Sequence, residues 1–256
     1  MSMPDQESIL NYKQARTIGR KYVADHSKDA FGGMLPVLDE LLKGVDVSGE
    51  LRLGEQEIPL NLVVGTRTAT RSNAFAGNFM PLLAENSEFG IKWCNLYNSH
   101  IEEGIRDPIR VYEYLNRYYV QEGNKRVSVL RYCQAVSVYA KVTRLIPRRD
   151  PSNKAVSIYY EFLDFDRRES FHNLWFSHRG SFTRLVGIVR DYTLLHPSED
   201  SVADLIREGY RHFRAAYHAA DMQIPITTGD AYLEYVCIFG FEPDPDPEQL
   251  AANVRN

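Results

Sequence analysis

The residue types best suited to binding an anion stand in one run of four, Gly123, Asn124, Lys125 and Arg126. Residues 118–121 before this run alternate and are rich in aromatic and β-branched types, which predicts the end of a buried strand. Val127 and Leu130 after it fall at helical spacing. A strand that turns into a helix leaves backbone N–H groups unpaired at the helix start, and the helix dipole adds partial positive charge there. The run is therefore a candidate site for phosphate or carboxylate.

Lys125 and Arg126 strengthen this prediction because they would lie in the first helical turn, where positive charge opposes the dipole. Two cations at that place cost helix stability unless an anion binds. Gly123 reaches backbone angles closed to other residues, and Asn124 is of a type that caps helices. The alternative is that both cations are solvated or paired with Glu122. The run alone leaves the two interpretations about equally supported.

Two further segments carry similar chemistry. In the loop at residues 65–73, arginines are interleaved with hydroxyl residues, and Thr70 and Arg71 are its candidate ligands. Such a mixture can surround an anion, although a solvated polar loop is the alternative. The second segment is residues 179–181, Arg-Gly-Ser, where a helix is predicted to start with Ser181 as its cap. Here too the anion site and the purely structural interpretation are equally supported.

Candidate acids for a nuclease or a nucleotide hydrolase lie near the first run. Glu122 precedes it directly, and Glu103 and Asp107 stand in the turn before the preceding strand. Two-metal phosphodiester cleavage needs carboxylates that converge on one place, and the sequence does not show that these do. No motif of a known hydrolase, Walker loop or dinucleotide site is present. Whether the protein is an enzyme therefore stays open.

Composition limits the classes of protein and the compartment. The chain has 256 residues and a net charge of -4, so attraction to nucleic acid or an anionic membrane would need a local patch. Three cysteines without paired spacing argue against a disulfide framework or a zinc site, and no metal site is predicted. The polar N-terminus lacks the apolar core of a signal peptide, and no run is long enough to span a bilayer. A cytoplasmic protein is expected.

Hydrophobic periodicity predicts an α+β chain that positions these residues. Strands are expected at residues 109–114, 118–121 and 136–146, in extended chain within 51–64, and at 173–177. Helices are expected at 8–26, at 35–42 with Pro36 in the first turn, at 87–103 with Ile101 facing inward, and at 127–133, 181–189, 202–219 and 231–239. The predicted division is a helical extension at 1–50, a mixed-sheet domain at 51–150, and a mainly helical region at 151–256 packed on that core.

The order of these elements from about Glu55 to Pro147 resembles the ParB/sulfiredoxin superfamily, specifically the N-terminal domain of ParB-like proteins. Members carry a glycine, a polar residue and one or two basic residues at the same strand-to-helix turn. The Pro108-Ile109 pair that opens the preceding strand also matches. Beyond Pro151 the resemblance to these members ends. Residues 123–130 and 175–182 are also similar to sequence at the front of bacterial proteins that join it to a binding-protein-like domain, and no such domain is expected after it here.

The resemblance implies a nucleotide or nucleic-acid phosphate site. ParB-like domains hold the triphosphate of a nucleotide at the basic turn, the corresponding sulfiredoxin loop binds ATP phosphates, and other members are nucleases. Carried over to this chain, the implied phosphate ligands are Gly123, Asn124, Lys125 and Arg126, assisted by Thr70 and Arg71, with Arg106 and Asp107 at the turn that walls the pocket. Glu122 takes the place of an acidic or small residue in the relatives and is the candidate catalytic residue.

Two departures limit what is carried over. Sulfiredoxin chemistry needs a cysteine in this turn, where the chain has Asn124 and no cysteine before Cys133. ParB partition proteins continue into a helix-turn-helix, whereas residues 201–220 read as one long helix. The leading hypothesis is therefore a regulatory protein that binds a nucleoside triphosphate with Mg²⁺, with or without slow hydrolysis. One alternative is a nucleic-acid-binding or nuclease protein that uses the same turn. The other is a protein-interaction module that binds no small ligand and associates with itself as a homodimer or with another protein.

Overall fold

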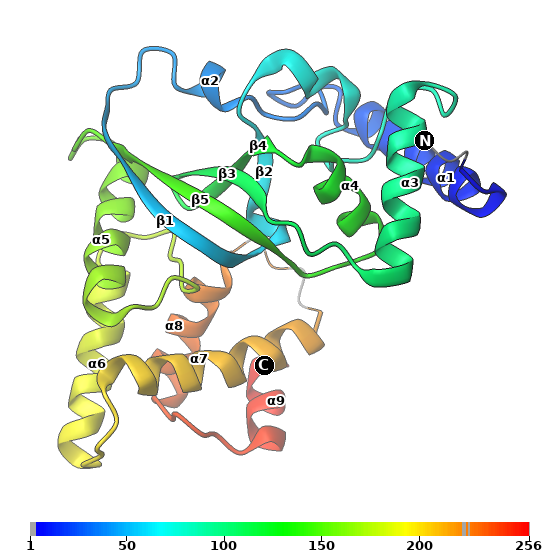
Figure 1. The fold of residues 1–256 in the computed structure, drawn as a ribbon. Helices are drawn as coiled ribbons and strands as arrows, with labels where there is room; N and C mark the ends of the chain where they lie inside the picture. The colour runs from blue at the N-terminus through cyan, green and yellow to red at the C-terminus, as the bar shows by residue number, and fades with distance from the viewer. Residues whose placement is uncertain (1–3, 222–223, 225, 256) are drawn as a thin grey trace. The chain divides into compact units, whose positions relative to one another are not determined.

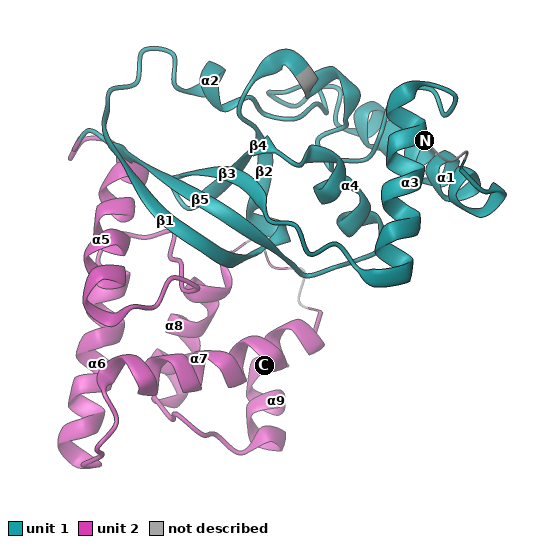
Figure 2. Cartoon of the chain, viewed as in Figure 1, with its two compact units in different colours: residues 1–148 teal, residues 149–256 magenta. Residues whose placement is uncertain are grey.

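The computed structural model describes residues 4–221, 224 and 226–255, and of Arg71 it describes only the backbone. The chain divides into two compact units, Met1–Arg148 (unit 1) and Arg149–Asn256 (unit 2), which are coloured separately in Figure 2. Its elements make a mixed α+β fold, so the predicted fold class is confirmed. Within the described residues, no helix combines the length and the apolar character that a bilayer-spanning segment requires.

Unit 1 is built on a mixed sheet (Figure 1). In the described chain five strands pair in the order β1-β5-β3-β4-β2. They are β1 (Val47–Pro59), β2 (Val63–Thr66), β3 (Ile109–Tyr114), β4 (Arg117–Glu122) and β5 (Ser137–Pro147). β2 runs parallel to β4 and β3 parallel to β5, whereas β1 with β5 and β3 with β4 are antiparallel. The carboxyl ends of β2 and β4 therefore lie at the same edge of the sheet.

The β3–β4 hairpin follows from its turn residues. Leu115 and Asn116 both have positive φ, 51° and 59°, as the two central residues of a type I′ turn require. Glu113 at the end of β3 lies opposite Arg144 of β5, and the two form a buried ion pair of 2.5 Å between Nε and Oε2. The second oxygen of Glu113 accepts the backbone N–H of Asn116 at 2.7 Å. The carboxylate thus fixes the hairpin to the sheet.

The helices of unit 1 are α1 (Gln6–Asp25), α2 (Leu38–Leu41), α3 (Glu88–Glu103) and α4 (Asn124–Tyr132), with 3-10 segments at Leu60–Leu62 and Ala69–Ala74. Val127 and Leu130 of α4 pack on buried residues of β3, β4 and β5. Leu38 of α2 packs with Tyr119 and Leu145 in a separate cluster. Two predictions were wrong here. Pro36 precedes α2 instead of lying in its first turn, and Ile101 of α3 is 63% exposed.

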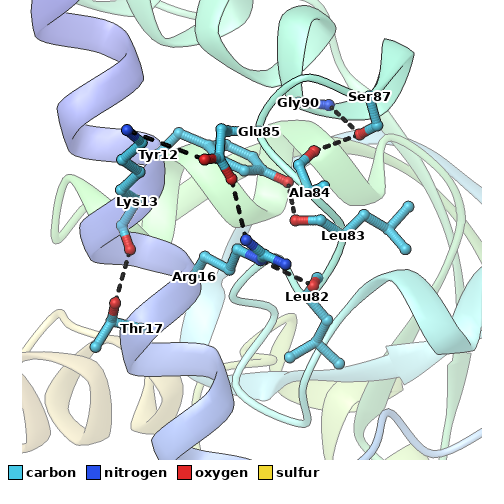
Figure 3. A network of polar contacts seen from close by, with 10 residues as sticks. All are labelled: Tyr12, Lys13, Arg16, Thr17, Leu82, Leu83, Ala84, Glu85, Ser87 and Gly90. Carbon is cyan, nitrogen blue, oxygen red and sulfur yellow. Dashed lines mark hydrogen bonds and ion pairs between the residues drawn. The ribbon is translucent and has the colours of Figure 1, made fainter.

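α1 belongs to the fold of unit 1 through a polar network, shown in Figure 3. The Tyr12 hydroxyl donates to the carbonyl of Leu83 at 3.1 Å, and Arg16 Nε donates to the carbonyl of Leu82 at 3.1 Å. Arg16 also pairs with Glu85 at 3.0 Å. Tyr12 and Ala15 are fully buried next to Trp93 of α3. Residues 1–50, predicted as an extension, thus contribute a helix to the core of this unit.

Unit 2 is helical, with α5 (Lys154–Glu169), α6 (Ser181–Leu195), α7 (Val202–Ala219), α8 (Thr228–Phe239) and α9 (Pro247–Arg255). Aromatic side chains dominate its core. Phe182 lies 4.7 Å from Phe176 and 5.0 Å from Phe165 between ring centroids, at the separations that favour tilted and edge contacts. The aromatic and apolar residues 155–165 thus lie within the helix α5, which Asn153 caps at its start.

The predicted strand at residues 173–177 is wrong, because this segment is irregular in the structure. Leu174 and Phe176 are both fully buried, so the alternation that suggested a strand is real. The backbone has a different partner, however. Both carboxylate oxygens of Asp230 lie 3.1 Å from the N–H of Ser177 and accept from it. A buried side chain thus satisfies a backbone group that a neighbouring strand would otherwise bind.

Candidate functional site

The ends of β2 and β4 meet at the start of α4. The N–H of Arg67, which follows β2, donates to the carbonyl of Val120 in β4 at 2.8 Å. Thr66, the last residue of β2, is 2% exposed, and its hydroxyl donates to the same carbonyl at 3.1 Å. The residue after β4 is Gly123, and α4 begins immediately after it. Hydrogen bonds therefore join the ends of β2 and β4 at one place, although Thr66 and Val120 are 54 residues apart in the sequence.

Gly123 is the N-cap of α4, with φ 109° and ψ 17° in the left-handed region. The prediction that Asn124 caps the helix is wrong, since Asn124 is its first residue. A Cβ atom on Gly123 would lie 2.5 Å from Cγ2 of Ile109, so both the backbone angle and the space require glycine. Gly123 offers no side chain to the helix start. Its carbonyl accepts the first helical bond, from Val127 N–H, at 3.0 Å.

Asn124 is 7% exposed, which is unusual for a residue at a helix start. Its amide nitrogen Nδ2 donates to the hydroxyl oxygen of Thr66 at 3.4 Å. That hydroxyl already donates to Val120, so it can only accept from the amide. The amide oxygen Oδ1 is buried and finds no hydrogen-bond partner in the described chain. A buried acceptor without a hydrogen-bond partner destabilises the fold by about 1–3 kcal/mol. A ligand that donates a hydrogen bond to Oδ1 would remove this cost.

Lys125 lies in the first turn of α4 with its ammonium 4.7 Å from the centroid of the Phe89 ring. This distance fits a cation–π contact. Its positive charge also reaches Glu88, whose pKa is lowered mainly by a hydrogen bond from Lys92 and to a lesser degree by Lys125. The ammonium therefore lies between the aromatic face of α3 and the start of α4.

Arg126 has acceptors within the protein. Its Nη1 donates to the carbonyls of Asp107 and Pro108, at 2.9 and 2.7 Å, and its Nη2 lies 3.7 Å from Glu122 Oε1. The guanidinium thereby ties α4 to the turn before β3. Its charge does not require an external anion. A phosphate-binding role for Arg126 stays a prediction, and its geometry indicates first of all a structural one.

The predicted acids and the turn residue Arg106 lie at the same end of unit 1. Glu122 is 61% exposed at its side chain and lies 3.6 Å from Arg110 as well as near Arg126. Glu103, Arg106 and Asp107 line a hollow of about 370 Å³ next to Arg126. In the residues that the structure describes, no three acidic, histidine or cysteine side chains are grouped for a metal ion. A catalytic role for Glu122 remains a prediction.

The second predicted element is placed only in part. Thr70 is exposed in the 3-10 segment Ala69–Ala74, and none of the described hydrogen bonds joins it to α4. The side chain of Arg71 lies outside the described part of the structure. Thr66 is the residue that sequence reasoning missed in this loop. The signal was a hydroxyl placed directly after the apolar residues of a strand, where a buried side chain is expected.

The helix start at α6 offers a direct comparison. Gly180 is its N-cap with φ 80°, and Ser181, predicted as the cap, is the first helical residue, so that prediction was wrong. The N–H of Gly180 donates to Oε2 of Glu161 at 2.7 Å. A carboxylate of the protein itself therefore occupies this start. The corresponding N–H of Gly123 has no carboxylate acceptor in the described chain.

Unit 2 contains a Ser–His–Asp cluster whose geometry does not match a catalytic triad. Nδ1 of His178 lies 3.1 Å from the hydroxyl of Ser177 and 3.5 Å from Asp230. A catalytic relay needs opposite ring nitrogens for the serine and the carboxylate, whereas both contacts here use the same one. Burial alone would raise the pKa of Asp230, but hydrogen bonds from Ser177 and Thr227 outweigh it and lower that pKa. The cluster is structural.

Comparisons with known proteins add little. No protein-family model matches the chain, and no curated protein sequence does either. A solved structure with some likeness is that of the C-terminally truncated chromosome-partitioning protein ParB from Caulobacter crescentus complexed with CTP-gamma-S. It is 13% identical, with a TM-score of 0.25 over 79% of this chain and 99% of that chain. So low a TM-score and identity carry no argument about ligand or family, and the resemblance to ParB-like proteins stays a prediction.

Proposed function

We propose that unit 1 binds a nucleoside triphosphate through its phosphates at the start of α4. The observation that carries this proposal is the buried Asn124, whose Oδ1 has no hydrogen-bond partner in the described chain, at a helix start without a side-chain cap. Free amides and the dipole of a nine-residue helix favour an anion at this end. Lys125 adds a full positive charge in the same turn. Gly123 allows the backbone to approach the ligand closely.

The type of ligand follows from what Asn124 lacks. Its Oδ1 is an acceptor, and fully ionised phosphate oxygens are acceptors too, so a phosphate group alone does not satisfy it. A hydroxyl or amino group of the attached nucleoside can donate to Oδ1 while the phosphates accept from the helix start. This supports a nucleotide over a simple inorganic anion. The superfamily resemblance of residues 55–147 implies the same class of ligand.

Magnesium would come with the nucleotide. Mg²⁺ is usually held by phosphate oxygens, water and one or two carboxylates, which suits a site without a carboxylate cluster in the described chain. Glu122 is the nearest acid in the sequence to the phosphate turn. Nucleotide binding does not require hydrolysis. Slow hydrolysis assisted by Glu122 would be a separate activity of the same site.

The test is a thermal-shift panel of the common nucleoside triphosphates, each with and without Mg²⁺. A ligand that binds only the folded state at about 100 times its Kd stabilises it by about 2.7 kcal/mol. We expect one nucleotide to raise the melting temperature with saturation. Lys125→Ala and Asn124→Ala should each reduce its affinity, by about tenfold or more. Lys141→Ala is the matched control, because Lys141 is a lysine of unit 1 that pairs with Glu55 at 3.0 Å on the sheet.

Other outcomes would overturn the proposal. Binding of single-stranded or duplex nucleic acid with a steep salt dependence, lost in Lys125→Ala, would show that the turn holds backbone phosphate instead. No shift with any nucleotide, together with unchanged behaviour of Lys125→Ala, would favour a protein-interaction module. Equal loss in the Lys141→Ala control would show that general surface charge is responsible.

A further inference from the structure

Arg131, near the carboxyl end of α4, has a guanidinium that no carboxylate of the described residues pairs with. Both hydrogen bonds that it makes in the described chain use Nη2, which donates to the carbonyls of Leu60 and Val63 at 2.7 Å each. Its central carbon lies 4.9 Å from the centroid of the Phe79 ring. Burial lowers the pKa of this guanidinium, and the nearby Tyr22 phenol offsets only part of that effect. A desolvated cation without an ion-pair partner is energetically costly.

Arg131 lines a surface groove of about 1080 Å³ between α1, α3 and the end of α4. One kind of lining residue is apolar. Ile18 of α1 and Ile101 of α3 are 48% and 63% exposed, and Tyr97 of α3 stacks on Trp93 with 5.7 Å between ring centroids. Exposed isoleucines on both walls of one groove are costly in water, so a covering apolar group would stabilise them.

The other kind of lining residue carries an amide. Asn61, Asn78 and Gln134 all line the groove. The amide oxygen of Asn78 accepts the N–H of Met80 at 3.1 Å, so its nitrogen keeps its donors. Side-chain amides can pair with the N–H and C=O groups of an extended backbone. The groove thus combines a cation, apolar walls and amide donors.

We propose that this groove docks an extended segment of a partner protein whose acidic side chain, flanked by aliphatic residues, pairs with Arg131. The carboxylate of the segment forms an ion pair with Arg131, and its aliphatic neighbours pack on Ile18 and Ile101. The backbone of the segment forms hydrogen bonds with the side-chain amides. The groove volume is at the upper end of what small-molecule pockets offer, which suits a peptide. A nucleic-acid strand fits less well, because the described lining residues include a single arginine and the walls are apolar.

The experiment is an NMR titration of the ¹⁵N-labelled full chain with two matched peptides, acetyl-Leu-Ile-Glu-Leu-amide and acetyl-Leu-Ile-Gln-Leu-amide. We expect saturable shifts of amide signals from Ile101, Tyr132 and Gln134 with the glutamate peptide. The glutamine peptide should bind about tenfold more weakly, since it lacks the charge-assisted hydrogen bond. In Arg131→Gln the two peptides should bind equally. Ile101→Glu should abolish binding of both, because it places a negative charge on the apolar wall.

Controls separate docking from unfolding and from simple anion binding. Leu10→Glu alters a side chain of α1 that is 57% exposed and does not line the groove, so it should bind both peptides like the unaltered chain. Arg131→Gln also removes two structural hydrogen bonds, so its melting curve must be compared; if it unfolds, Ile101→Glu decides. The proposal is overturned if neither peptide shifts these signals, if both bind the unaltered chain equally, or if acetate binds as tightly as the glutamate peptide. It does not depend on the nucleotide site at the other end of α4, which Lys125→Ala tests separately.

Discussion

The helices α4 and α6 start from the same local feature and differ in what meets that start. Each follows a glycine in the left-handed region, Gly123 with φ 109° and Gly180 with φ 80°. At α6 the carboxylate of Glu161, from the helix α5, accepts the Gly180 N–H at 2.7 Å. At α4 the described chain supplies a buried amide, Asn124, whose oxygen has no partner.

The comparison teaches that a glycine before a helix does not by itself indicate a ligand site. At α6 the Glu161 carboxylate already interacts with the positive end of the helix, so an external anion would gain little binding free energy there. At α4 the nearby carboxylate, Glu122, pairs with Arg126 and does not cap the helix start, and the unsatisfied acceptor of Asn124 adds a reason for a ligand. Matching changes at the two helix starts can therefore be compared with each other.

The largest expected effect comes from alanine at the two glycines. Gly123→Ala must hold a left-handed backbone angle and place its Cβ against Ile109, and we expect it to lower the free energy of unfolding by about 3 kcal/mol. Gly180→Ala meets no atom within 4 Å, so only the backbone angle opposes it, at a cost of about 1 kcal/mol. Urea unfolding followed by tryptophan fluorescence measures both, since Trp93 reports on unit 1 and Trp175 on unit 2. Equal effects would contradict the close packing of Gly123.

The second prediction concerns the satisfied carboxylate Asp230 of unit 2. Its pKa is lowered in the folded protein, so the unfolded chain takes up the proton first as the pH falls. The stability that it contributes is therefore present above the ordinary aspartate value of 3.8 and is lost as the pH falls through the lower folded-state pKa. Asp230→Asn should lower the unfolding free energy at neutral pH by about 2 kcal/mol and flatten this acid dependence.

Trp175 is the probe for that experiment, because its carbonyl accepts the Thr227 hydroxyl at 3.0 Å within the same cluster. Unfolding curves at neutral and acidic pH should show the difference between the unaltered chain and Asp230→Asn disappearing in acid. If the difference in unfolding free energy between the two proteins stays constant with pH, Asp230 stabilises the fold through packing and not through its charge.

The third prediction places an anion at α4, as the fold already does at α6. Asn124→Asp puts a carboxylate at the helix start, where it would repel phosphate. We expect the nucleotide found by the thermal-shift panel to bind at least about tenfold more weakly, a change of about 1.4 kcal/mol. Calorimetric titration measures the affinity, and a melting curve checks the fold. Unchanged affinity in a folded variant would place the phosphates elsewhere.

The smallest expected effect is the reverse change at α6. Glu161→Gln removes the negative charge that meets Gly180 while keeping an oxygen that can accept the same N–H. Loss of the charge at the helix start should cost about 0.5–1 kcal/mol in unit 2. Adding sulfate should restore part of that stability in the variant and have less effect on the unaltered chain. If sulfate stabilises the variant and the unaltered chain equally, the charge of Glu161 does not stabilise the start of α6.

Periodicity was enough to predict most of the elements. β3 was predicted with its observed bounds, and α3, α7 and β5 agree within a residue or two, because their apolar residues recur at the spacing of a half-buried helix or strand. Residues 173–177 show the limit of this signal. Leu174 and Phe176 alternate with less buried residues as in a strand, yet Asp230, more than 50 residues later, accepts the backbone hydrogen bond from Ser177. No local pattern can reveal that partner.

The sequence by itself determined the strand, the glycine turn and the helix that place Gly123, Asn124, Lys125 and Arg126, since these depend on neighbouring residues. The tertiary structure decided what each side chain meets: carbonyls of Asp107 and Pro108 for Arg126, the Phe89 ring for Lys125, and Thr66 for Asn124. The same holds for Glu161 at α6 and for the unneutralised Arg131. The physical reason is that burial and charge compensation depend on residues that only the folded chain brings within a few ångströms of one another.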